Sequence, residues 1–246
     1  MALIKKFTDT LDDGISNAEW DRYDGTIKLE TETYNTRFAQ TPGFKRFNWL
    51  VFKAVVWIES GGPKVWKGKL VLDNKIWTSM PMQIGNAGDA GYPTLVGRKE
   101  ATNIIMSEDL KQKLPTARTN PIVNIQAGMA YLVNRLSESE IQSVLDTKDT
   151  QQYEHPVVHG DTLSGIAEKF GTTVSVLEQL NPGVGVLHPG KMKLKYQKAS
   201  MRRVITGWRE LNAQNVMDYY NVRDRTYAEK ITYALSLFPK LQRPKP

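Results

Sequence analysis

Residues 153–197 read YEHPVVHGDTLSGIAEKFGTTVSVLEQLNPGVGVLHPGKMKLKYQ, and this stretch predicts a small folded module. Two short runs in its middle carry apolar residues at helical spacing. They are separated by Gly171, which suits a helix end, and by Thr172-Thr173, which suits a helix start. Residues 192–196 alternate apolar side chains with lysines, which is the period of a strand. The segment is therefore expected to fold as strand, helix, helix, strand.

Four pieces of this stretch closely resemble the LysM module: Gly160-Asp161-Thr162-Leu163, Ile166-Ala167, Leu180-Asn181-Pro182 and Pro189-Gly190. LysM modules bind glycans that contain N-acetylglucosamine, so the resemblance implies a glycan groove between the loop at 160–162 and the loop after Asn181. The residues implied to contact the glycan are Gly160, Asp161, Thr162, Asn181 and Pro182. Asp161 is at least as well explained as a helix cap.

The segments on either side of this module differ in character. Residues 138–152 are polar and predict a linker or a short polar helix. Residues 202–241 contain too many large apolar side chains to remain in water, so they must pack on another part of the chain. We therefore expect residues 1–150 to form the first part of a catalytic domain, residues 153–197 to be a LysM insert, and residues 199–246 to supply C-terminal helices that complete the domain.

In the first part of the chain, a helix is predicted to begin at Thr41-Pro42 and to stop at Gly61-Gly62-Pro63. Its apolar side chains surround most of the helix, so it is expected to be buried. Glu59 falls in the last turn, where partial desolvation and the negative end of the helix dipole both raise a carboxyl pKa. A carboxyl with a raised pKa suits the general acid of glycosidic cleavage. The alternative from position alone is an exposed glutamate at a fraying helix end.

Three further motifs follow in order: residues 79–86, SMPMQIGN; residues 124–132, NIQAGMAYL; and residues 219–221, YYN, with Tyr227 beyond them. Together with Glu59-Ser60-Gly61 they resemble the motifs of soluble lytic transglycosylases and goose-type lysozymes. The resemblance covers roughly residues 45–135 and 203–240. It implies a lysozyme-like catalytic domain of α+β class, mainly α, into which the small LysM domain is inserted.

The resemblance implies roles for individual residues. Glu59 would protonate the glycosidic oxygen and then act as a base. The residues implied to bind substrate are Ser60, Met82, Gln83, Asn124, Tyr220 and Tyr227. The two tyrosines are equally well explained as core residues. The sequence departs from the family in one motif, where Met80-Pro81 replace the expected glycine and leucine.

Residues 70–77 are expected to form a small hairpin that turns at Asp73-Asn74. This makes Asp73 a second catalytic carboxylate, with Asp89 as the alternative. A second carboxylate that holds water would give inverting hydrolysis, whereas attack by the muramic hydroxyl would give a 1,6-anhydro sugar without one. Both outcomes remain open at this point, as does a non-catalytic, structural peptidoglycan-binding protein.

Composition excludes several other chemistries. The chain has no cysteine, so it lacks cysteine nucleophiles, thiolate zinc sites and disulfides. Its three histidines, His155, His159 and His188, lie within the LysM-like stretch, so a histidine zinc site in the catalytic domain is not expected. We therefore expect no metal and no cofactor. The net charge of +7 favours anionic partners, yet no nucleic-acid-binding motif is present.

The chain has no apolar run long enough to insert into a membrane, and its first residues lack a secretory signal. We therefore expect synthesis in the cytoplasm and action in the periplasm or cell wall of a target bacterium. An antibacterial effector delivered by a contractile (type VI) secretion system and a phage lysin both fit. The partners are expected to be peptidoglycan glycan strands and, for an effector, a cognate immunity protein or a secretion-system carrier.

Overall fold

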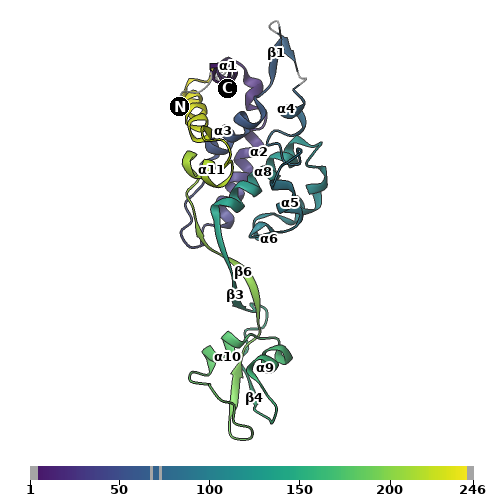
Figure 1. Ribbon diagram of the computed structural model, residues 1–246, viewed down its shortest axis with the longest axis vertical. Coiled ribbons are helices and arrows are strands. Elements are labelled where there is room, and N and C mark those ends of the chain that lie inside the picture. Colours follow the sequence, from purple (N-terminus) through teal and green to yellow (C-terminus); the bar gives the residue numbers. More distant parts are fainter. Residues whose placement is uncertain (1–4, 67–68, 72–73, 243–246) are drawn as a thin grey trace. The chain divides into compact units, whose positions relative to one another are not determined.

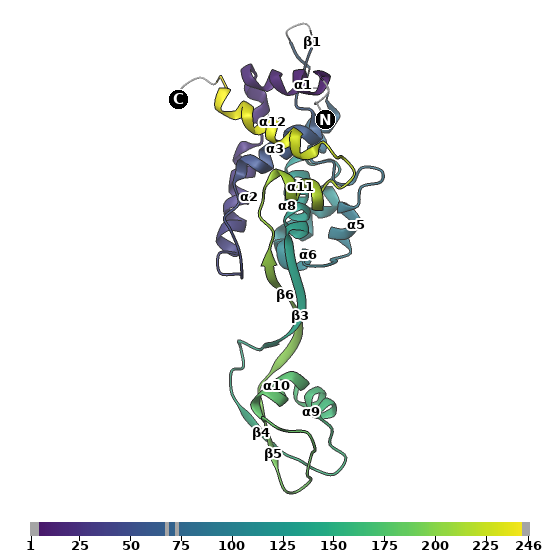
Figure 2. The ribbon, with the colours of Figure 1, turned by 60° about the vertical axis from the view of Figure 1, so that its left-hand side comes forward.

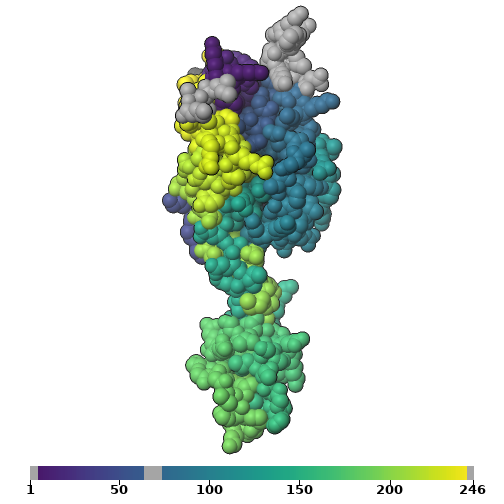
Figure 3. All heavy atoms as spheres, in the orientation of Figure 1, coloured from purple at the N-terminus to yellow at the C-terminus, as the bar shows by residue number. Residues whose placement is uncertain are grey.

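The computed structural model describes residues 5–66, 69–71 and 74–242. The chain divides into two compact units, which are described separately here. The larger unit comprises residues 1–139 and 205–246, and the smaller unit comprises residues 140–204. Within the larger unit, the C-terminal residues, yellow in Figure 3, lie against the N-terminal residues, which are purple. In the described residues, no helix is both long and apolar enough to span a membrane.

The larger unit is mainly helical (Figure 1). Its elements in chain order are α1 (Lys5–Ser16), a 3₁₀ helix (Ala18–Asp21), α2 (Asp24–Arg37), α3 (Trp49–Ser60), β1 (Lys64–Trp66), β2 (Lys69–Val71), α4 (Lys75–Ser79), α5 (Gly91–Val96), α6 (Thr102–Ile105), α7 (Glu108–Lys113), a 3₁₀ helix (Leu114–Thr116), α8 (Pro121–Leu136), α11 (Ala213–Tyr219), α12 (Tyr227–Leu237) and a 3₁₀ helix (Phe238–Lys240).

Helix α3 forms the centre of the larger unit, and its side chains are buried on nearly every face, as the sequence predicts. Asn48 caps its first turn by accepting a hydrogen bond from the N–H of Leu50 at 3.0 Å. Gly61 ends it in the left-handed conformation, with φ of 65°. The helix therefore stops where the sequence indicates, with Glu59 in its last turn.

The predicted start of this helix at Thr41-Pro42 is wrong, because tertiary contacts hold residues 44–48 outside any helix. Asn35 of α2 accepts a hydrogen bond from the N–H of Phe47 at 2.7 Å and donates to its carbonyl at 3.2 Å. The Thr41 hydroxyl is also engaged, since it accepts a hydrogen bond from Trp208 at 2.7 Å. These contacts come from distant parts of the chain, which explains why local spacing misplaced the helix start.

A buried lysine lies at the middle of α3. The Lys53 side chain is 2% exposed, and its ammonium group lies 2.6 Å from a carboxylate oxygen of Asp21 and 2.8 Å from one of Asp24. It also lies over the rings of Trp57 and Phe238, at 5.3 and 5.2 Å from their centroids. Burial of a charge is tolerated here because two carboxylates and these aromatic faces replace its hydration.

Helix α8 packs along α2 and the short helices α4–α7, and it begins at Asn120, its N-cap, and Pro121. Gly128 lies where α8 approaches the loop that carries Met82. A Cβ atom at Gly128 would lie 2.5 Å from both Cβ and Sδ of Met82, which is itself 2% exposed. The glycine therefore allows α8 and this loop to pack closely.

We expect Gly128→Ala to destabilise the larger unit by about 1–3 kcal/mol, because Met82 cannot move its Cβ without moving the backbone. The control is Gly25→Ala on α2, where an added Cβ meets nothing within 4 Å. Gly25→Ala is expected to be neutral or to stabilise by up to about 1 kcal/mol. Urea unfolding followed by tryptophan fluorescence measures both, and equal midpoints for the two variants would contradict this packing argument.

The C-terminal segment packs on the core of the larger unit, as predicted. Val216, Tyr227, Ile231, Ala234 and Leu237 are buried in the same cluster as α3 and α8. Figures 1 and 2 both show α12 beside α3. The prediction of helices throughout residues 199–246 is wrong at its start, however, because β6 (Ala199–Trp208) is a strand.

Strand β6 pairs with β3 (Ser137–Leu145). Residues 137–145 are therefore neither the linker nor the polar helix that their composition predicted. The strand is exposed over most of its length, so its polar composition is compatible with pairing. Its partner lies some sixty residues further along the chain, where no local pattern indicates it.

The predicted hairpin at residues 70–77 is also wrong. The hairpin is formed by β1 and β2, which pair antiparallel with Lys64 opposite Val71, and residues 75–79 form α4. Asn74 is buried rather than in a solvent-exposed turn, and its side-chain amide donates to the carbonyls of Ser60 and Gly62 at 3.0 and 2.5 Å. It thereby ties the start of α4 to the end of α3.

The smaller unit contains β4 (Tyr153–Pro156), α9 (Leu163–Phe170), α10 (Val174–Leu180) and β5 (Lys193–Tyr196), in the predicted order. Strands β4 and β5 pair antiparallel, with Tyr153 opposite Tyr196. Thr162 and Thr173 cap the two helices, and Gly171 ends α9 with φ of 63°. Its core consists of Val157, Ile166, Ala167, Leu177, Leu194 and Tyr196.

Candidate active site

A cavity of about 520 Å³ opens beside Glu59 in the larger unit. Its wall comes from four segments that are distant in the sequence: the end of α3, the loop between α4 and α5, the second half of α8, and residues 219–223. Of the predicted site residues, Glu59, Met82, Gln83 and Tyr220 line this cavity. Tyr131 of residues 124–132 also lines it, so the fold brings together residues from all four motifs.

Glu59 is half-buried, and both of its carboxyl oxygens are engaged. Oε1 accepts a hydrogen bond from the hydroxyl of Tyr227 at 2.5 Å, and Oε2 accepts one from the side-chain amide of Gln83 at 3.1 Å. The carboxyl is therefore held in one orientation by two side chains that lie 24 and 168 residues away in the sequence.

Burial raises the pKa of Glu59 above its usual range. Hydrogen bonds from Tyr227, Gln83 and Asn221, and the charge of Lys230, oppose this shift, but burial outweighs them. A carboxyl of this kind keeps its proton to a higher pH than an exposed glutamate does. This shift favours a role as a proton donor.

Gln83 has a backbone conformation that places its side chain against Glu59. Its φ is 55°, in the left-handed region that non-glycine residues seldom occupy. Its amide donates to the backbone carbonyl of Glu59 at 2.6 Å as well as to the carboxyl, and its Oε1 accepts a hydrogen bond from Asn86 at 2.8 Å. The strained backbone is thus fixed by three hydrogen bonds from one side chain.

Asn124 does not line the cavity and has no exposed surface. Its side-chain oxygen accepts from the N–H of Met82 at 2.9 Å, and its amide donates to the carbonyls of Ile84 and Ala117 at 2.9 and 2.8 Å. The structure therefore gives Asn124 a positioning role, which is to hold the loop on either side of Gln83, in place of the predicted contact with substrate.

Ser60 is likewise buried, at 6% exposed. Its hydroxyl donates to the carbonyl of Val56 at 2.6 Å and accepts from the N–H of Gly62 at 3.1 Å. It shapes the turn after α3 and is not available to bind substrate. Met82, also implied to bind substrate, is buried against α8, although part of it reaches the cavity.

The two tyrosines differ in position. Tyr227, at the start of α12, is 2% exposed and reaches the cavity only through its bond to Glu59. Tyr220 lines the cavity wall, with its ring 5.7 Å from that of Tyr131 and 6.4 Å from that of Tyr227. Burial, and next the charge of Glu59, raises the pKa of both hydroxyls well above their usual range, so both remain protonated donors.

Asp73 lies outside the described residues. Asp89, the other candidate second carboxylate, lines the cavity. Its two oxygens accept hydrogen bonds from the backbone N–H groups of Gly85, Gly91 and Tyr92 at 2.7, 2.7 and 2.9 Å. Asp89 thus organises the loop that forms one side of the cavity while presenting its carboxylate there.

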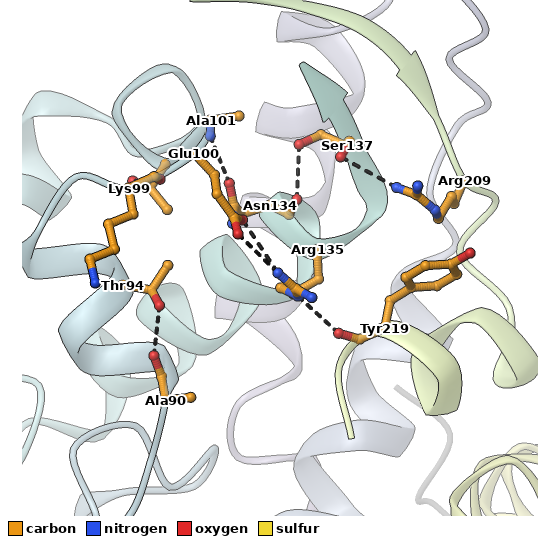
Figure 4. Close-up of polar contacts among 11 residues, drawn as sticks. Ala90, Thr94, Lys99, Glu100, Ala101, Asn134, Arg135, Ser137, Arg209 and Tyr219 are labelled. Atoms are coloured by element: carbon orange, nitrogen blue, oxygen red, sulfur yellow. Dashed lines mark hydrogen bonds and ion pairs between the residues drawn. The ribbon is translucent and has the colours of Figure 1, made fainter. Parts of the chain in front are cut away.

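Arg135, which no sequence motif indicated, joins three segments at the cavity (Figure 4). Its Nε donates to the backbone carbonyl of Tyr219 at 3.0 Å, and its guanidinium pairs with Glu100 at 3.1 Å. Glu100 also accepts a hydrogen bond from Asn134 at 2.6 Å. Arg135 therefore attaches the end of α11 to α8, and an arginine near a helix end carries no sequence signal for such a role.

In the smaller unit, three of the predicted glycan contacts have structural partners. Asp161 accepts from the N–H of Val158 and lies 2.8 Å from the ring of His155, so it is not the helix cap; Thr162 is. The side chain of Asn181 joins the end of α10 to the backbone of Lys195 in β5, at 2.8 and 2.9 Å. Gly160, with φ of 88°, and Pro182 lie in turns beside these residues.

Most of the smaller unit matches a known domain family. Residues 155–192 match the LysM domain family. This LysM domain indicates that the chain associates with peptidoglycan and hence with the cell wall. No curated protein and no solved structure matches the chain. Among the described residues, no group of three or more His, Cys, Asp or Glu side chains is placed to hold a metal ion.

The hydrogen bond from Tyr227 provides a test of how the pKa of Glu59 is set. The bond favours the ionised carboxylate, so we expect Tyr227→Phe to raise the pKa of Glu59 further. Carbon-13 NMR of the glutamate side-chain carboxyls across pH measures this directly. The control is Tyr233→Phe. Tyr233 lies on the same helix as Tyr227, but its hydroxyl donates to Asp12 at 2.7 Å. A Glu59 pKa that falls in Tyr227→Phe would contradict the assignment.

Proposed function

We propose that this protein cleaves the glycan strands of peptidoglycan at the β-1,4 bond between N-acetylmuramic acid and N-acetylglucosamine, with Glu59 as the general acid. One observation carries the proposal. Glu59 lies in the wall of a cavity, and burial raises the pKa of its carboxyl, which favours proton donation. The order of the four sequence motifs also supports a lysozyme-like or lytic transglycosylase mechanism.

In this mechanism Glu59 donates its proton to the glycosidic oxygen as the bond from that oxygen to the anomeric carbon breaks. The leaving sugar departs with a neutral hydroxyl, and positive charge develops on the remaining ring. In the route that forms a 1,6-anhydro sugar, Glu59, now a carboxylate, takes a proton from the C6 hydroxyl that attacks the anomeric carbon. The hydrogen bonds from Tyr227 and Gln83 stabilise this ionised form, which suits a residue that acts first as an acid and then as a base.

The nucleophile determines the product. Attack by the C6 hydroxyl of the muramic ring needs no second carboxylate and gives a 1,6-anhydro sugar. Attack by water gives a reducing end and, with inversion, requires a carboxylate to activate the water at roughly 6.5–9.5 Å from the acid. Among the described residues, Asp89 is the carboxylate that shares the cavity with Glu59.

The LysM domain supports this proposal by supplying a reason for the chain to be at the polymer. A second binding module on the same chain raises the effective concentration of the catalytic unit near its substrate. The same domain would serve a non-catalytic protein equally well. The experiment must therefore measure bond cleavage rather than binding.

We would digest purified peptidoglycan with the wild type, with Glu59→Gln and with Asp89→Asn, and identify the muropeptides by mass spectrometry. Products lighter by one water than reducing-end muropeptides indicate transglycosylation. Reducing-end products that disappear in Asp89→Asn indicate a muramidase with Asp89 as the base. An absence of wild-type products, with binding to the polymer retained, contradicts the proposal and leaves a wall-binding structural protein.

We further propose that the target is the cell wall of another bacterium, reached as an antibacterial effector or, alternatively, as a phage lysin. Cleavage of a wall polymer is harmful to any cell that has it, and this supports either role. An effector needs a cognate immunity protein in the producing cell, whereas a lysin does not. Recovery of a producer protein that binds the chain and blocks cleavage would favour the effector.

A further inference from the structure

The segment between α11 and α12 presents an arginine to the cavity that holds Glu59. Arg223 lines this cavity and is exposed. Two other arginines of the larger unit have acidic partners, since Arg135 pairs with Glu100 and Arg209 pairs with Glu138 at 3.0 Å. Arg223 has no ion pair or side-chain hydrogen bond among the described residues. Its charge is therefore available to a bound molecule.

The backbone around Arg223 is fixed. The N–H of Asn221 donates to the carbonyl of Val216 at 3.1 Å, and the N–H of Asp224 donates to the carbonyl of Asn221 at 3.3 Å. The neighbouring acid, Asp224, does not neutralise Arg223. Its carboxylate instead pairs with Lys230 at 2.5 Å and accepts hydrogen bonds from the backbone and hydroxyl of Thr226 at 2.9 and 2.7 Å.

Val222 lines the same cavity and is 55% exposed. The exposed aliphatic side chain of Val222 lies next to the guanidinium of Arg223, which has no partner among the described residues. Together they form a surface with an apolar part and a cationic part. The two acidic residues that line the cavity are less available than Arg223 for binding a charged group. The carboxyl oxygens of Glu59 accept hydrogen bonds from Tyr227 and Gln83, and the oxygens of Asp89 accept three backbone hydrogen bonds.

We propose that Val222 and Arg223 bind the lactyl arm of N-acetylmuramic acid, with Arg223 pairing with a carboxylate that this arm carries. The inference rests on the proposed function for the identity of the polymer. The lactyl arm has a methyl group for Val222 and, in strands without peptides, a free carboxylate. In intact strands the arm carries the stem peptide, whose carboxylates supply the same chemistry. A guanidinium binds either one through paired, charge-assisted hydrogen bonds.

Arg223 then determines specificity rather than chemistry. It selects glycans with an acidic substituent over chitin-like glycans, which have N-acetylglucosamine alone. A hydrogen-bonded charge pair of this kind contributes roughly 10- to 100-fold in apparent affinity. We therefore expect Arg223→Gln to lower kcat/KM by about this factor on muramic-acid polymers and to leave cleavage of chitin oligosaccharides unchanged.

The test compares three polymers: peptide-bearing strands, strands from which an amidase has removed the peptides, and chitin oligosaccharides. The matched control is Arg225→Gln, which makes the same change of charge two residues away at an exposed position that does not line the cavity. A loss confined to stripped strands identifies the lactyl carboxylate, and one confined to intact strands identifies the peptide. Equal losses on all three polymers, no loss on any, or the same losses in Arg225→Gln would overturn the inference.

A binding measurement separates this inference from the proposed function. The full chain with Glu59→Gln is titrated with N-acetylmuramic acid and, separately, with N-acetylglucosamine, while nitrogen-15 NMR follows the arginine side chains. We expect a shift at Arg223 with the first sugar alone. That result in a protein whose wild type cleaves none of the polymers would refute the glycosidase and keep the binding site. No selective shift at Arg223 would refute the site, whatever the enzyme does.

Discussion

Replacing Glu59 by glutamine is expected to slow cleavage of peptidoglycan by roughly 10²- to 10⁴-fold, the usual contribution of a general acid. Glutamine is similar in size and can still accept the hydrogen bond from Tyr227, but it has no proton to donate to the glycosidic oxygen. Its amide would also face that of Gln83, where the carboxylate now accepts. Binding to the polymer through the LysM domain should be unaffected.

The same substitution is expected to change how stability depends on pH. Burial raises the folded-state pKa of Glu59 above the ordinary value of about 4.3 that applies to the unfolded chain. Between these two values the folded state binds more protons, so this group lowers wild-type stability as pH rises through that interval. Glu59→Gln lacks the effect. The stability of the variant relative to wild type should therefore increase from about pH 4 towards neutral pH.

Rates of muropeptide release and urea midpoints at several pH values measure these two effects. Glu210→Gln is the matched control, since Glu210 is exposed and forms only a surface ion pair with Lys45 at 3.3 Å. It should keep the wild-type rate and pH dependence. A Glu59→Gln protein with wild-type activity would remove Glu59 from the chemistry. Parallel stability curves for wild type and variant would contradict the raised pKa.

Replacing Lys53 by methionine is expected to cost about 3–5 kcal/mol at neutral pH, because it leaves two partly buried carboxylates without their cation. Burial already raises the pKa of Asp24, and the charge of Lys53 opposes that rise. Without Lys53 the folded-state pKa rises further. The variant should therefore recover part of its stability as pH falls and Asp24 binds a proton.

Tryptophan fluorescence is a specific probe for this experiment. All six tryptophans, at positions 20, 49, 57, 66, 77 and 208, belong to the larger unit, so unfolding of the smaller unit leaves the signal unchanged. The control is Lys45→Met, which breaks an exposed ion pair and should cost at most about 1 kcal/mol. Similar losses in the two lysine variants would contradict the role of burial at Lys53.

The smaller unit could be predicted from its sequence because its signals are local. Thr162, Thr173 and Gly171 act within a few residues of their own positions, as caps and as a helix end. Helix ends in the larger unit could be predicted only where the signal is also local, at the end of α3 and at the start of α8. The start of α3 depends on tertiary contacts of Asn35 and Trp208, which helical periodicity does not predict.

The residues of the candidate site could likewise be predicted only in part. The apolar helix before Gly61 indicates Glu59, and the burial that raises its pKa follows from that position. By contrast, Asn124 was assigned to substrate although it is fully buried, because a motif gives residue types and not the direction of a side chain. Arg135 and Arg223 line the cavity although neither belongs to a motif. Their position depends on segments that meet only in the folded protein.

The pairing of β3 with β6 has a consequence for the entropy of the chain. The N–H of Arg209 donates to the carbonyl of Leu136 at 2.8 Å, so the chain leaves the larger unit and returns to it at adjacent points. While the smaller unit is folded, this connection costs no more entropy than a tight turn. Once it unfolds, residues 140–204 become a long open loop whose closure costs about 2 kcal/mol more. A glycan that stabilises the LysM domain therefore also stabilises, through chain entropy alone, the unit that carries Glu59.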